Sequence, residues 1–136
     1  VMSEHLQDKK KQLAALRDAP SPLLAIAETH LRLLGGNRDL AVVFQVELRQ
    51  STKFMERFSA THLREYLGII RDVIARGQSI GIFRKNLNPT LAAKLLFGML
   101  DEMATNWILS RRKYSLIADA DAIVDLFVRG VGTERA

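Results

Sequence analysis

The stretch VFQVELR, residues 43–49, decides whether this chain is entirely helical or contains a β-strand. From Phe44 to Arg49 its apolar and polar residues alternate without a break, which is the period of a half-buried strand. The segments on both sides have helical spacing, however, so a single strand would find no neighbour for its backbone N–H and C=O groups. We therefore predict a helix over residues 38–50 and an all-α fold.

Proline and glycine divide the rest of the chain into further helices. Ser21 and Pro22 form a good N-cap and first-position pair, and the helix they open stops at Gly35. Asn88 and Pro89 open a later helix in the same way. The patterns together predict six helices, at residues 2–18, 22–34, 38–50, 56–79, 89–112 and 116–131.

Composition indicates one compact domain over residues 1–136, with 48% hydrophobic and 26% charged residues. No apolar run approaches the roughly 18 residues that a membrane span needs, and the first residues lack the apolar core of a signal peptide. We expect a cytoplasmic protein that does not enter a membrane. The absence of cysteine excludes disulfides, thiolate metal sites and cysteine nucleophiles.

The 20 basic and 15 acidic residues give a net charge of +5, which favours an anionic partner. The basic residues are scattered, with small clusters at residues 9–11, 84–85 and 111–113. A DNA-reading face would gather them into one patch or stripe. This chain is therefore not expected to read DNA by itself.

Nothing in the sequence indicates catalysis. His5, His30 and His62 stand far apart without metal-ligand spacing, so no metal site is expected. His30 falls on the apolar side of its helix and is interpreted as a core histidine with a hydrogen-bond partner. There is no nucleophile elbow, phosphate loop or dinucleotide fingerprint, so we predict neither enzymatic activity nor catalytic residues.

Arg49 is the most informative candidate for a binding site. The helix over residues 38–50 has apolar residues on nearly every side, and Gln45 and Arg49, four apart, share one face of it. A guanidinium in such a setting needs a partner because it does not deprotonate. Either an acidic side chain supplies that partner, or Arg49 meets an anionic ligand with support from Gln45. The acidic candidates are Glu47, Asp101 and Glu102.

Several aromatic or flexible residues fall on inward faces of the predicted helices. Most such residues are ordinary core, although methionines also suit a cavity that adapts to a flexible apolar ligand. Both interpretations stay open. The predicted ligand-binding residues are Phe44, Gln45, Leu48, Arg49, Tyr66, Ile70, Met99, Met103 and Trp107.

The last two helices are candidates for contact with a second chain. The helix over residues 89–112 has an apolar arc broad enough for its own core and a partner, and the helix over residues 116–131 has a regular apolar stripe. Glu102 and Asn106, four apart, are interpreted as a hydrogen bond to a neighbouring helix. The predicted dimer-interface residues are Phe97, Leu100, Ala104, Ile108, Ile123, Phe127 and Val131.

Two long stretches resemble a known family. NRDLAVVFQVELRQS, residues 37–51, and the segment from YLGIIRDVIARG to SRRKYSL, residues 66–116, resemble the C-terminal domain of TetR-family transcriptional repressors. More narrowly, they are similar to fatty-acid-degradation regulators of the FadR type, and the similarity runs over about residues 22–131. ELRQS at residues 47–51 and DEMATNW at residues 101–107 are the more specific motifs.

The G-x-x-x-G-x-F motif at Gly77, Gly81 and Phe83, followed by NPTLAA, is general to many TetR-like proteins. The resemblance implies a homodimeric, all-helical effector domain whose last two helices form a four-helix bundle with those of the second subunit. In the FadR-like branch the ligand is a long-chain acyl-CoA, with its acyl chain in an apolar tunnel and its CoA part at a more polar opening. Ligand binding releases the repressor from operator DNA.

Members of this family begin with a helix-turn-helix domain of about 45 to 50 residues. This chain shows none, since its first residues resemble the helix that links the two domains. We therefore expect an effector domain that reaches operator DNA only through a domain missing from this chain. The position of Arg49 in the ELRQS motif favours a ligand contact.

The expected function is sensing of long-chain acyl-CoA by the dimerisation domain of a TetR-like repressor of fatty-acid metabolism. No cofactor is expected apart from acyl-CoA as effector. The alternatives are a dimerisation scaffold without a natural ligand and a sensor of another hydrophobic molecule. An enzyme is the weakest interpretation.

Overall fold

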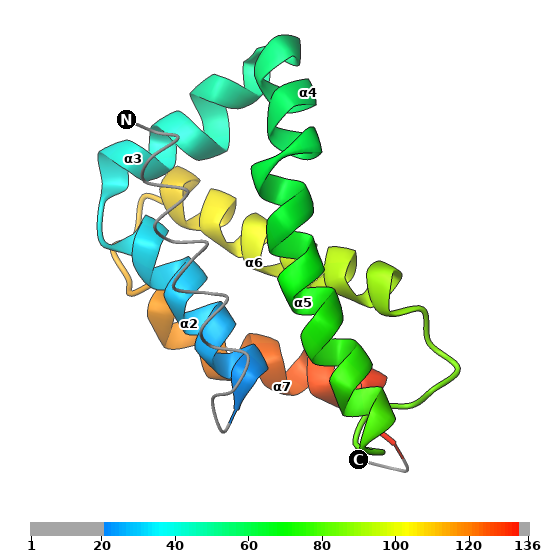
Figure 1. Ribbon diagram of the computed structural model, residues 1–136. Helices are drawn as coiled ribbons and strands as arrows, with labels where there is room; N and C mark the ends of the chain where they lie inside the picture. The colour runs from blue at the N-terminus through cyan, green and yellow to red at the C-terminus, as the bar shows by residue number, and fades with distance from the viewer. Residues whose placement is uncertain (1–20, 134–136) are drawn as a thin grey trace.

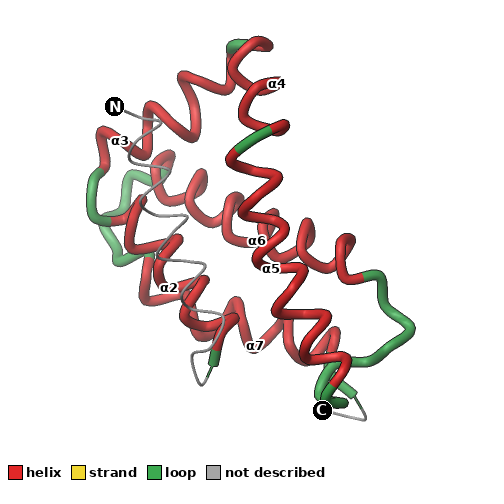
Figure 2. Tube along the Cα trace, viewed as in Figure 1, coloured by secondary structure: helices red, strands yellow, loops and turns green. Residues whose placement is uncertain are grey.

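The computed structural model describes residues 21–133, and these residues form a bundle of helices without a β-strand (Figures 1 and 2). The prediction of an all-α fold is confirmed. The helix predicted at residues 2–18 lies outside the described residues. The α-helices are α2 (Pro22–Gly35), α3 (Arg38–Val42), α4 (Thr52–Ala60), α5 (His62–Ser79), α6 (Pro89–Leu109) and α7 (Ala120–Val131).

The stretch at residues 43–49 is helical, as predicted, but it is not one uniform helix. After α3 the chain continues as a π-helix, η2 (Val43–Glu47), and then as a 3-10 helix, η3 (Leu48–Gln50). The segment is also less enclosed than predicted. Only Ala41, Phe44 and Gln45 are buried, whereas the valines around them are half-buried. Of the three polar residues that give the strand-like alternation, only Gln45 is buried, whereas Glu47 is exposed and Arg49 is half-buried.

The helix predicted at residues 56–79 is in fact two helices, because the backbone leaves the helical region at Thr61 with φ −123° and ψ −93°. Figure 2 shows this break as a short loop between α4 and α5. The first of the two helices also begins earlier than predicted. Ser51 caps it by accepting a hydrogen bond from the backbone N–H of Phe54 at 3.1 Å.

The other helix ends differ from the predictions by a few residues. Asn88 caps α6 as predicted, accepting from Thr90 N at 2.8 Å, but this helix ends at Leu109 rather than near residue 112. The last helix opens with a short 3-10 turn, η4 (Ile117–Asp119). Ser21 makes no side-chain cap on α2, so only the following proline marks that start.

Helix α6 crosses the middle of the bundle, with α5 against it on one side and α2 and α7 on another (Figure 1). The core lies between these four helices. No helix of the described residues is long and apolar enough to cross a membrane. The largest fully buried side chains are Ile26, Leu31, Ile70, Ile74, Leu96, Leu100 and Leu116.

The turn between α5 and α6 is fastened to the end of α7. The Phe83 ring lies on Gly77 so closely that a Cβ atom there would be 2.3 Å from the ring. Arg84 N donates to Val131 O at 2.9 Å, and Thr133 N donates to Ile82 O at 3.2 Å. The G-x-x-x-G-x-F motif therefore has a packing role, because a glycine is needed under the phenylalanine ring.

Candidate functional site

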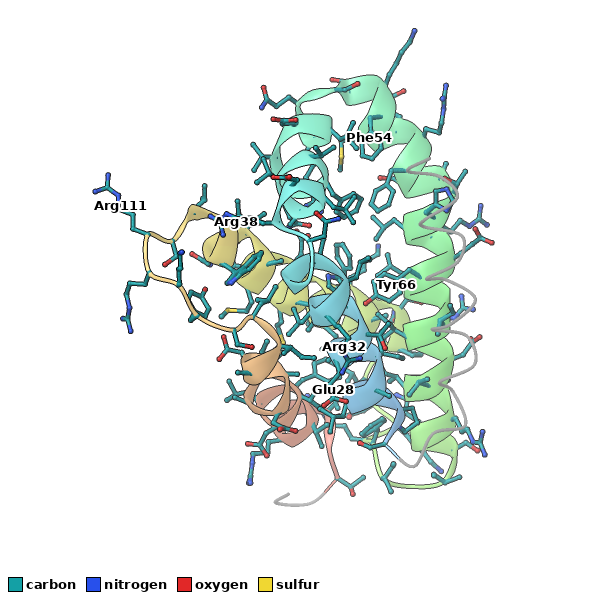
Figure 3. The ribbon with its side chains drawn as sticks, turned by 90° about the vertical axis from the view of Figure 1, so that its left-hand side faces the viewer. Glu28, Arg32, Arg38, Phe54, Tyr66 and Arg111 are labelled. Carbon is teal, nitrogen blue, oxygen red and sulfur yellow. The ribbon has the colours of Figure 1, made fainter. Side chains whose placement is uncertain are left out.

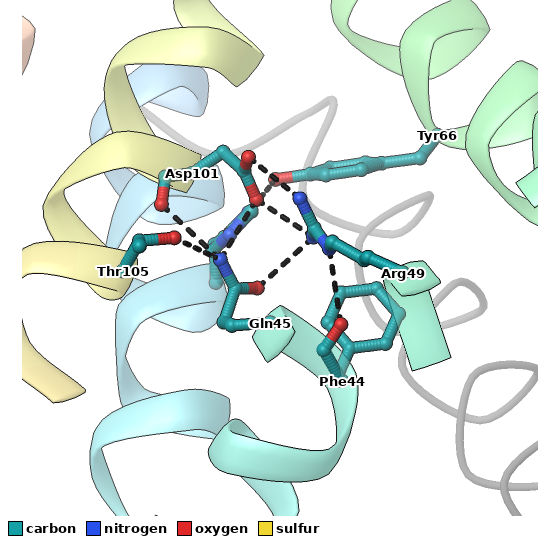
Figure 4. Close-up of polar contacts among 7 residues, drawn as sticks. Phe44, Gln45, Arg49, Tyr66, Asp101 and Thr105 are labelled. Atoms are coloured by element: carbon teal, nitrogen blue, oxygen red, sulfur yellow. Dashed lines mark hydrogen bonds and ion pairs between the residues drawn. The ribbon is translucent and has the colours of Figure 1, made fainter. Parts of the chain in front are cut away.

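Arg49 points from η3 toward α6 and forms a two-point ion pair with Asp101 (Figure 4). Its Nη1 and Nη2 atoms donate to Asp101 Oδ2 and Oδ1, each at 2.8 Å. The two side chains retain only 23% and 21% of their exposure, so solvent screens the pair incompletely. Of the three acidic partners considered from the sequence, the structure selects Asp101.

The same guanidinium also secures the irregular helix from which it comes. Its Nε donates to Phe44 O at 3.0 Å, and Nη2 donates to Gln45 Oε1 at 3.1 Å. Its carbon lies 5.0 Å from the centre of the Phe44 ring. Four of the five N–H groups of Arg49 are thus occupied by Phe44, Gln45 and Asp101. An anionic ligand could gain two contacts from Arg49 only by displacing some of these partners.

Gln45 joins η2 to α6 from within the bundle, with 5% of its surface exposed. Its Nε2 lies 2.9 Å from Thr105 Oγ1, 3.0 Å from Asp101 Oδ1 and 3.2 Å from Asp101 O. Asp101 and Thr105 were not among the predicted ligand-binding residues. The feature of the sequence that could have identified them is their spacing, because residues four apart lie on the same narrow polar face of α6.

A second polar pair lies beside this network. His30 Nδ1 and the hydroxyl of Tyr66 are 2.6 Å apart, which confirms His30 as a core histidine with a partner. The ring of Phe97 packs edge-on against both, with centroid distances of 5.9 Å and 5.8 Å. Figure 4 shows Tyr66 pointing from α5 toward Asp101 and Arg49.

Burial keeps both members of this pair neutral. It lowers the pKa of His30 to about 4, and the charge of Arg49 adds to the lowering while Asp101 opposes it. Burial also raises the pKa of the Tyr66 phenol, and the negative charge of Asp101 raises it further. At neutral pH the compensated pair of Arg49 and Asp101 is the charged part of an otherwise neutral polar site.

The structure brings together four of the nine predicted ligand-binding residues, namely Phe44, Gln45, Arg49 and Tyr66. The other five are dispersed. Ile70 is fully buried core, Leu48 is half-buried, and Met99 and Met103 pack against the core from α6. Trp107 lies near the end of α6, where its Nε1 donates to Tyr114 O at 2.8 Å.

The predicted dimer-interface residues face the interior of the chain. Leu100 and Ala104 have no exposed surface, and Phe97 packs on His30 and Tyr66. In the single chain these residues are therefore part of its own core, and α6 has a second apolar side, with Leu91, Leu95 and Leu109, that stays exposed. The side chains buried in the chain's own core are Leu100, Ala104, Ile108, Ile123, Phe127 and Val131.

Glu102 and Asn106 lie on the exposed face of α6. Asn106 Nδ2 donates to Glu102 Oε2 at 2.8 Å within the same helix, so the predicted bond to a neighbouring helix is wrong. Within residues 21–133 no group of three or more histidine, aspartate and glutamate side chains could hold a metal ion.

Both the sequence and the fold match a known protein family. The model of the family described as YsiA-like protein, C-terminal region, matches residues 1–130. The chain belongs to this family of TetR-type C-terminal domains. This YsiA-like domain is 29% identical over 130 residues to the fatty acid metabolism regulator protein of Bacillus subtilis, covering 96% of the chain and 67% of the relative.

Solved structures agree with this assignment. FadR from Bacillus subtilis in complex with stearoyl-CoA has a TM-score of 0.86 and 28% identity, covering 94% of the YsiA-like domain and 71% of FadR. FadR from Bacillus halodurans has a TM-score of 0.85 and 27% identity over the same shares. A TetR/AcrR regulator from Thermobifida fusca, at 21% identity and a TM-score of 0.71, covering 94% and 69%, shares the fold.

Proposed function

We propose that this YsiA-like domain senses a long-chain acyl-CoA for a transcriptional repressor of fatty acid metabolism. The observation that carries the proposal is the likeness, over 94% of the chain, to a FadR that holds stearoyl-CoA. Such a regulator acts in the cytoplasm. Operator DNA would be bound by a helix-turn-helix domain rather than by the residues described.

The polar network, which consists of Gln45, Arg49, Asp101 and Thr105 with His30 and Tyr66 beside them, suits the uncharged carbonyl group of an acyl thioester. The ion pair of Arg49 and Asp101 is internally compensated, and His30 and Tyr66 are neutral. An uncharged carbonyl can share a hydrogen bond there without leaving a buried charge unpaired. The acyl chain would lie among the aromatic and flexible side chains around the network. These include Phe44, Phe58, Phe97, Met99 and Met103.

Arg49 links ligand binding to a change of shape in this proposal. It joins the end of η3 to the middle of α6, so a ligand that enters between them has to rearrange its contacts. Short π and 3-10 segments often mark places where a helix can deform. The ligand shifts the equilibrium only by the difference in its affinity for the DNA-competent and DNA-incompetent shapes.

We further propose a homodimer in which α6 and α7 pack against the same helices of a second copy. Their exposed residues form stripes with helical spacing, and within residues 21–133 no atom beyond the local helix backbone lies within 4 Å of an ideal Cβ at Gly98 or Gly130. A partner helix could therefore approach closely at both glycines. The stripes consist of Leu91, Leu95, Gly98, Glu102, Asn106 and Leu109 on α6 and Ala122, Leu126 and Gly130 on α7.

Calorimetric titration of the chain with stearoyl-CoA and with free CoA tests the ligand assignment. We expect stearoyl-CoA to bind at micromolar concentration or below, and free CoA to bind far more weakly because it buries no acyl chain. If stearoyl-CoA produces no heat of binding at these concentrations, the domain is a scaffold or senses another molecule.

A further inference from the structure

The turn between α6 and α7 has three consecutive cations, Arg111, Arg112 and Lys113, which we call the basic turn. All three side chains are exposed, and none forms an ion pair with another residue of the described range 21–133. From Met103 to Ala118 the chain has no acidic residue. The basic turn is thus a local concentration of positive charge without a neighbouring acid in sequence.

The backbone of the basic turn is held in a defined shape. Ser110 Oγ accepts a hydrogen bond from Arg112 N at 3.1 Å and donates one to Arg112 O at 3.2 Å. On the far side, the bond from Trp107 Nε1 to Tyr114 O closes the turn. Figure 3 shows Arg111 pointing away from the body of the protein. The fold therefore presents these cations outward from a structured turn.

Arg38, at the start of α3, adds a fourth cation at the same end of α6 (Figure 3). Its Nη2 donates to Ile108 O at 2.6 Å, and its guanidinium carbon lies 5.2 Å from the centre of the Trp107 ring. The carboxyl end of a helix carries partial negative charge. Because Arg38 offsets this charge, the end of α6 does not cancel the positive field of the basic turn.

The basic turn lies at one end of the contact between α6 and the segment from Arg38 to Arg49, and the polar network lies within the same contact. Arg38 meets α6 at Ile108, and Gln45 meets it at Thr105 and Asp101, so the two segments run antiparallel. Asp101 and Ile108 are seven positions apart in α6, which corresponds to about 10 Å along the axis. A long ligand whose thioester lies near the network could therefore extend its polar end to the basic turn.

We propose that the basic turn and Arg38 bind the phosphate groups at the nucleotide end of an acyl-CoA thioester. Guanidinium groups match phosphate in geometry and charge. Tyr114, 39% exposed, follows the three cations directly and offers a ring on which an adenine base can stack. The assignment rests on the proposed function and adds to it the side chains that recognise the nucleotide.

Three thioesters with the same acyl chain test this site. Stearoyl-CoA has the complete nucleotide, stearoyl-dephospho-CoA lacks the 3′-phosphate, and stearoyl-pantetheine lacks the nucleotide. The test variant combines Arg111→Gln, Arg112→Gln and Lys113→Gln. The control combines Lys53→Gln, Arg57→Gln and Arg64→Gln, which removes three exposed positive charges from α4 and α5. Circular dichroism and thermal melts verify that both variants are folded.

We expect the unsubstituted chain to bind stearoyl-CoA about tenfold more tightly than stearoyl-pantetheine, with the dephospho form between them, as a few exposed charge contacts would produce. The basic-turn variant should bind all three thioesters with nearly the affinity of the unsubstituted chain for stearoyl-pantetheine. The control variant should keep the preference for the complete nucleotide.

A basic-turn variant that keeps the full preference overturns the assignment, as does an equal loss in both variants, which indicates long-range charge alone. If the basic-turn variant keeps the preference but loses affinity for duplex DNA, the turn contacts nucleic acid and the assignment is wrong. If the unsubstituted chain binds none of the thioesters, the proposed function itself fails and the nucleotide site fails with it.

Discussion

Arg49 and Asp101, 52 positions apart in the sequence, are joined by two hydrogen bonds of 2.8 Å that connect η3 to the middle of α6. Gln45 reinforces this connection from the preceding turn, since it accepts from Arg49 and donates to Asp101 and Thr105. The ion pair therefore fixes the irregular segment relative to the bundle.

Arg49→Met should destabilise the chain by about 2–3 kcal/mol, because it leaves the Asp101 carboxylate partly buried without its cation. The residual exposure of both side chains keeps the loss below that of a fully buried pair. Urea denaturation at neutral pH measures the difference. The double variant Arg49→Met/Asp101→Leu should recover part of it, since no charge is then left unpaired.

Arg129→Met is the matched control for Arg49→Met. Arg129 pairs with Asp125 at 3.0 Å on the surface of α7, where the side chains are 63% and 58% exposed. Its loss should cost less than about 0.5 kcal/mol. If Arg49→Met also leaves stability unchanged but abolishes thioester binding, Arg49 is a ligand contact rather than a structural cation.

The need of Arg49 for a partner was predictable from its chemistry, but the identity of the partner was not. Spacing along the chain cannot choose between Glu47, Asp101 and Glu102, because the choice depends on how α3 and η2 pack on α6. The irregularity of this helix could not be predicted for the same reason. Helical periodicity assigns residues 38–50 to one helix, whereas the observed π-helix places Gln45 inside the bundle, within reach of α6.

His30 should make stability depend on pH. Its pKa is about 4 in the folded chain against an ordinary 6.5, so between these values the unfolded chain binds a proton that the folded chain does not. The contribution of His30 to the free energy of unfolding should be fully present above pH 6.5. It should fall by up to about 3 kcal/mol as the pH drops to 4. Urea denaturation at a series of pH values measures this slope.

His30→Gln should remove that part of the pH dependence, because glutamine can accept the Tyr66 hydrogen bond but does not titrate. Tyr66→Phe should keep most of the slope, since burial is the largest cause of the lowered pKa. A His30→Gln chain with the same slope as the unsubstituted chain would show that other groups cause the dependence.

Gly77→Ala should destabilise the chain by about 2 kcal/mol or more. The new Cβ would lie 2.3 Å from the ring of Phe83, which is 6% exposed and has little room to move. Displacing the ring also disturbs the backbone bonds between this turn and the end of α7. Thermal melts measure the loss. The double variant Gly77→Ala/Phe83→Leu should lose less than the single variant, and an equal loss would mean that ring contact is not the cause.

The face of α6 was the hardest feature to predict from the sequence. Both of its sides are apolar, and a helical wheel ranks them equally because it has no information on neighbouring helices. The core takes Leu100 and Ala104, while Leu91, Leu95 and Leu109 remain on the surface. By contrast, proline marked the starts of α2 and α6 correctly, because its preference for the first helical turn is local.

The proposed dimer predicts which leucines hold two copies together. Leu95→Glu and Leu126→Glu should each convert the dimer to a monomer, because each replaces an apolar contact of the proposed interface with a charge. Ile80→Glu is the control, since Ile80 is 65% exposed but lies just beyond the end of α5, outside the two stripes. Sedimentation velocity at micromolar concentration measures the oligomeric state.

Gly98→Ala separates dimer contact from stability of the single chain. Among the described residues of one chain, no atom beyond the local helix backbone lies within 4 Å of the added methyl group, so alanine should leave the helix unharmed or stabilise it by up to about 1 kcal/mol. In a dimer with close approach at Gly98, the same methyl group should weaken self-association. If Leu95→Glu and Gly98→Ala both sediment as the unsubstituted dimer does, the second copy binds to another face, and an unsubstituted chain that sediments as a monomer contradicts the homodimer itself.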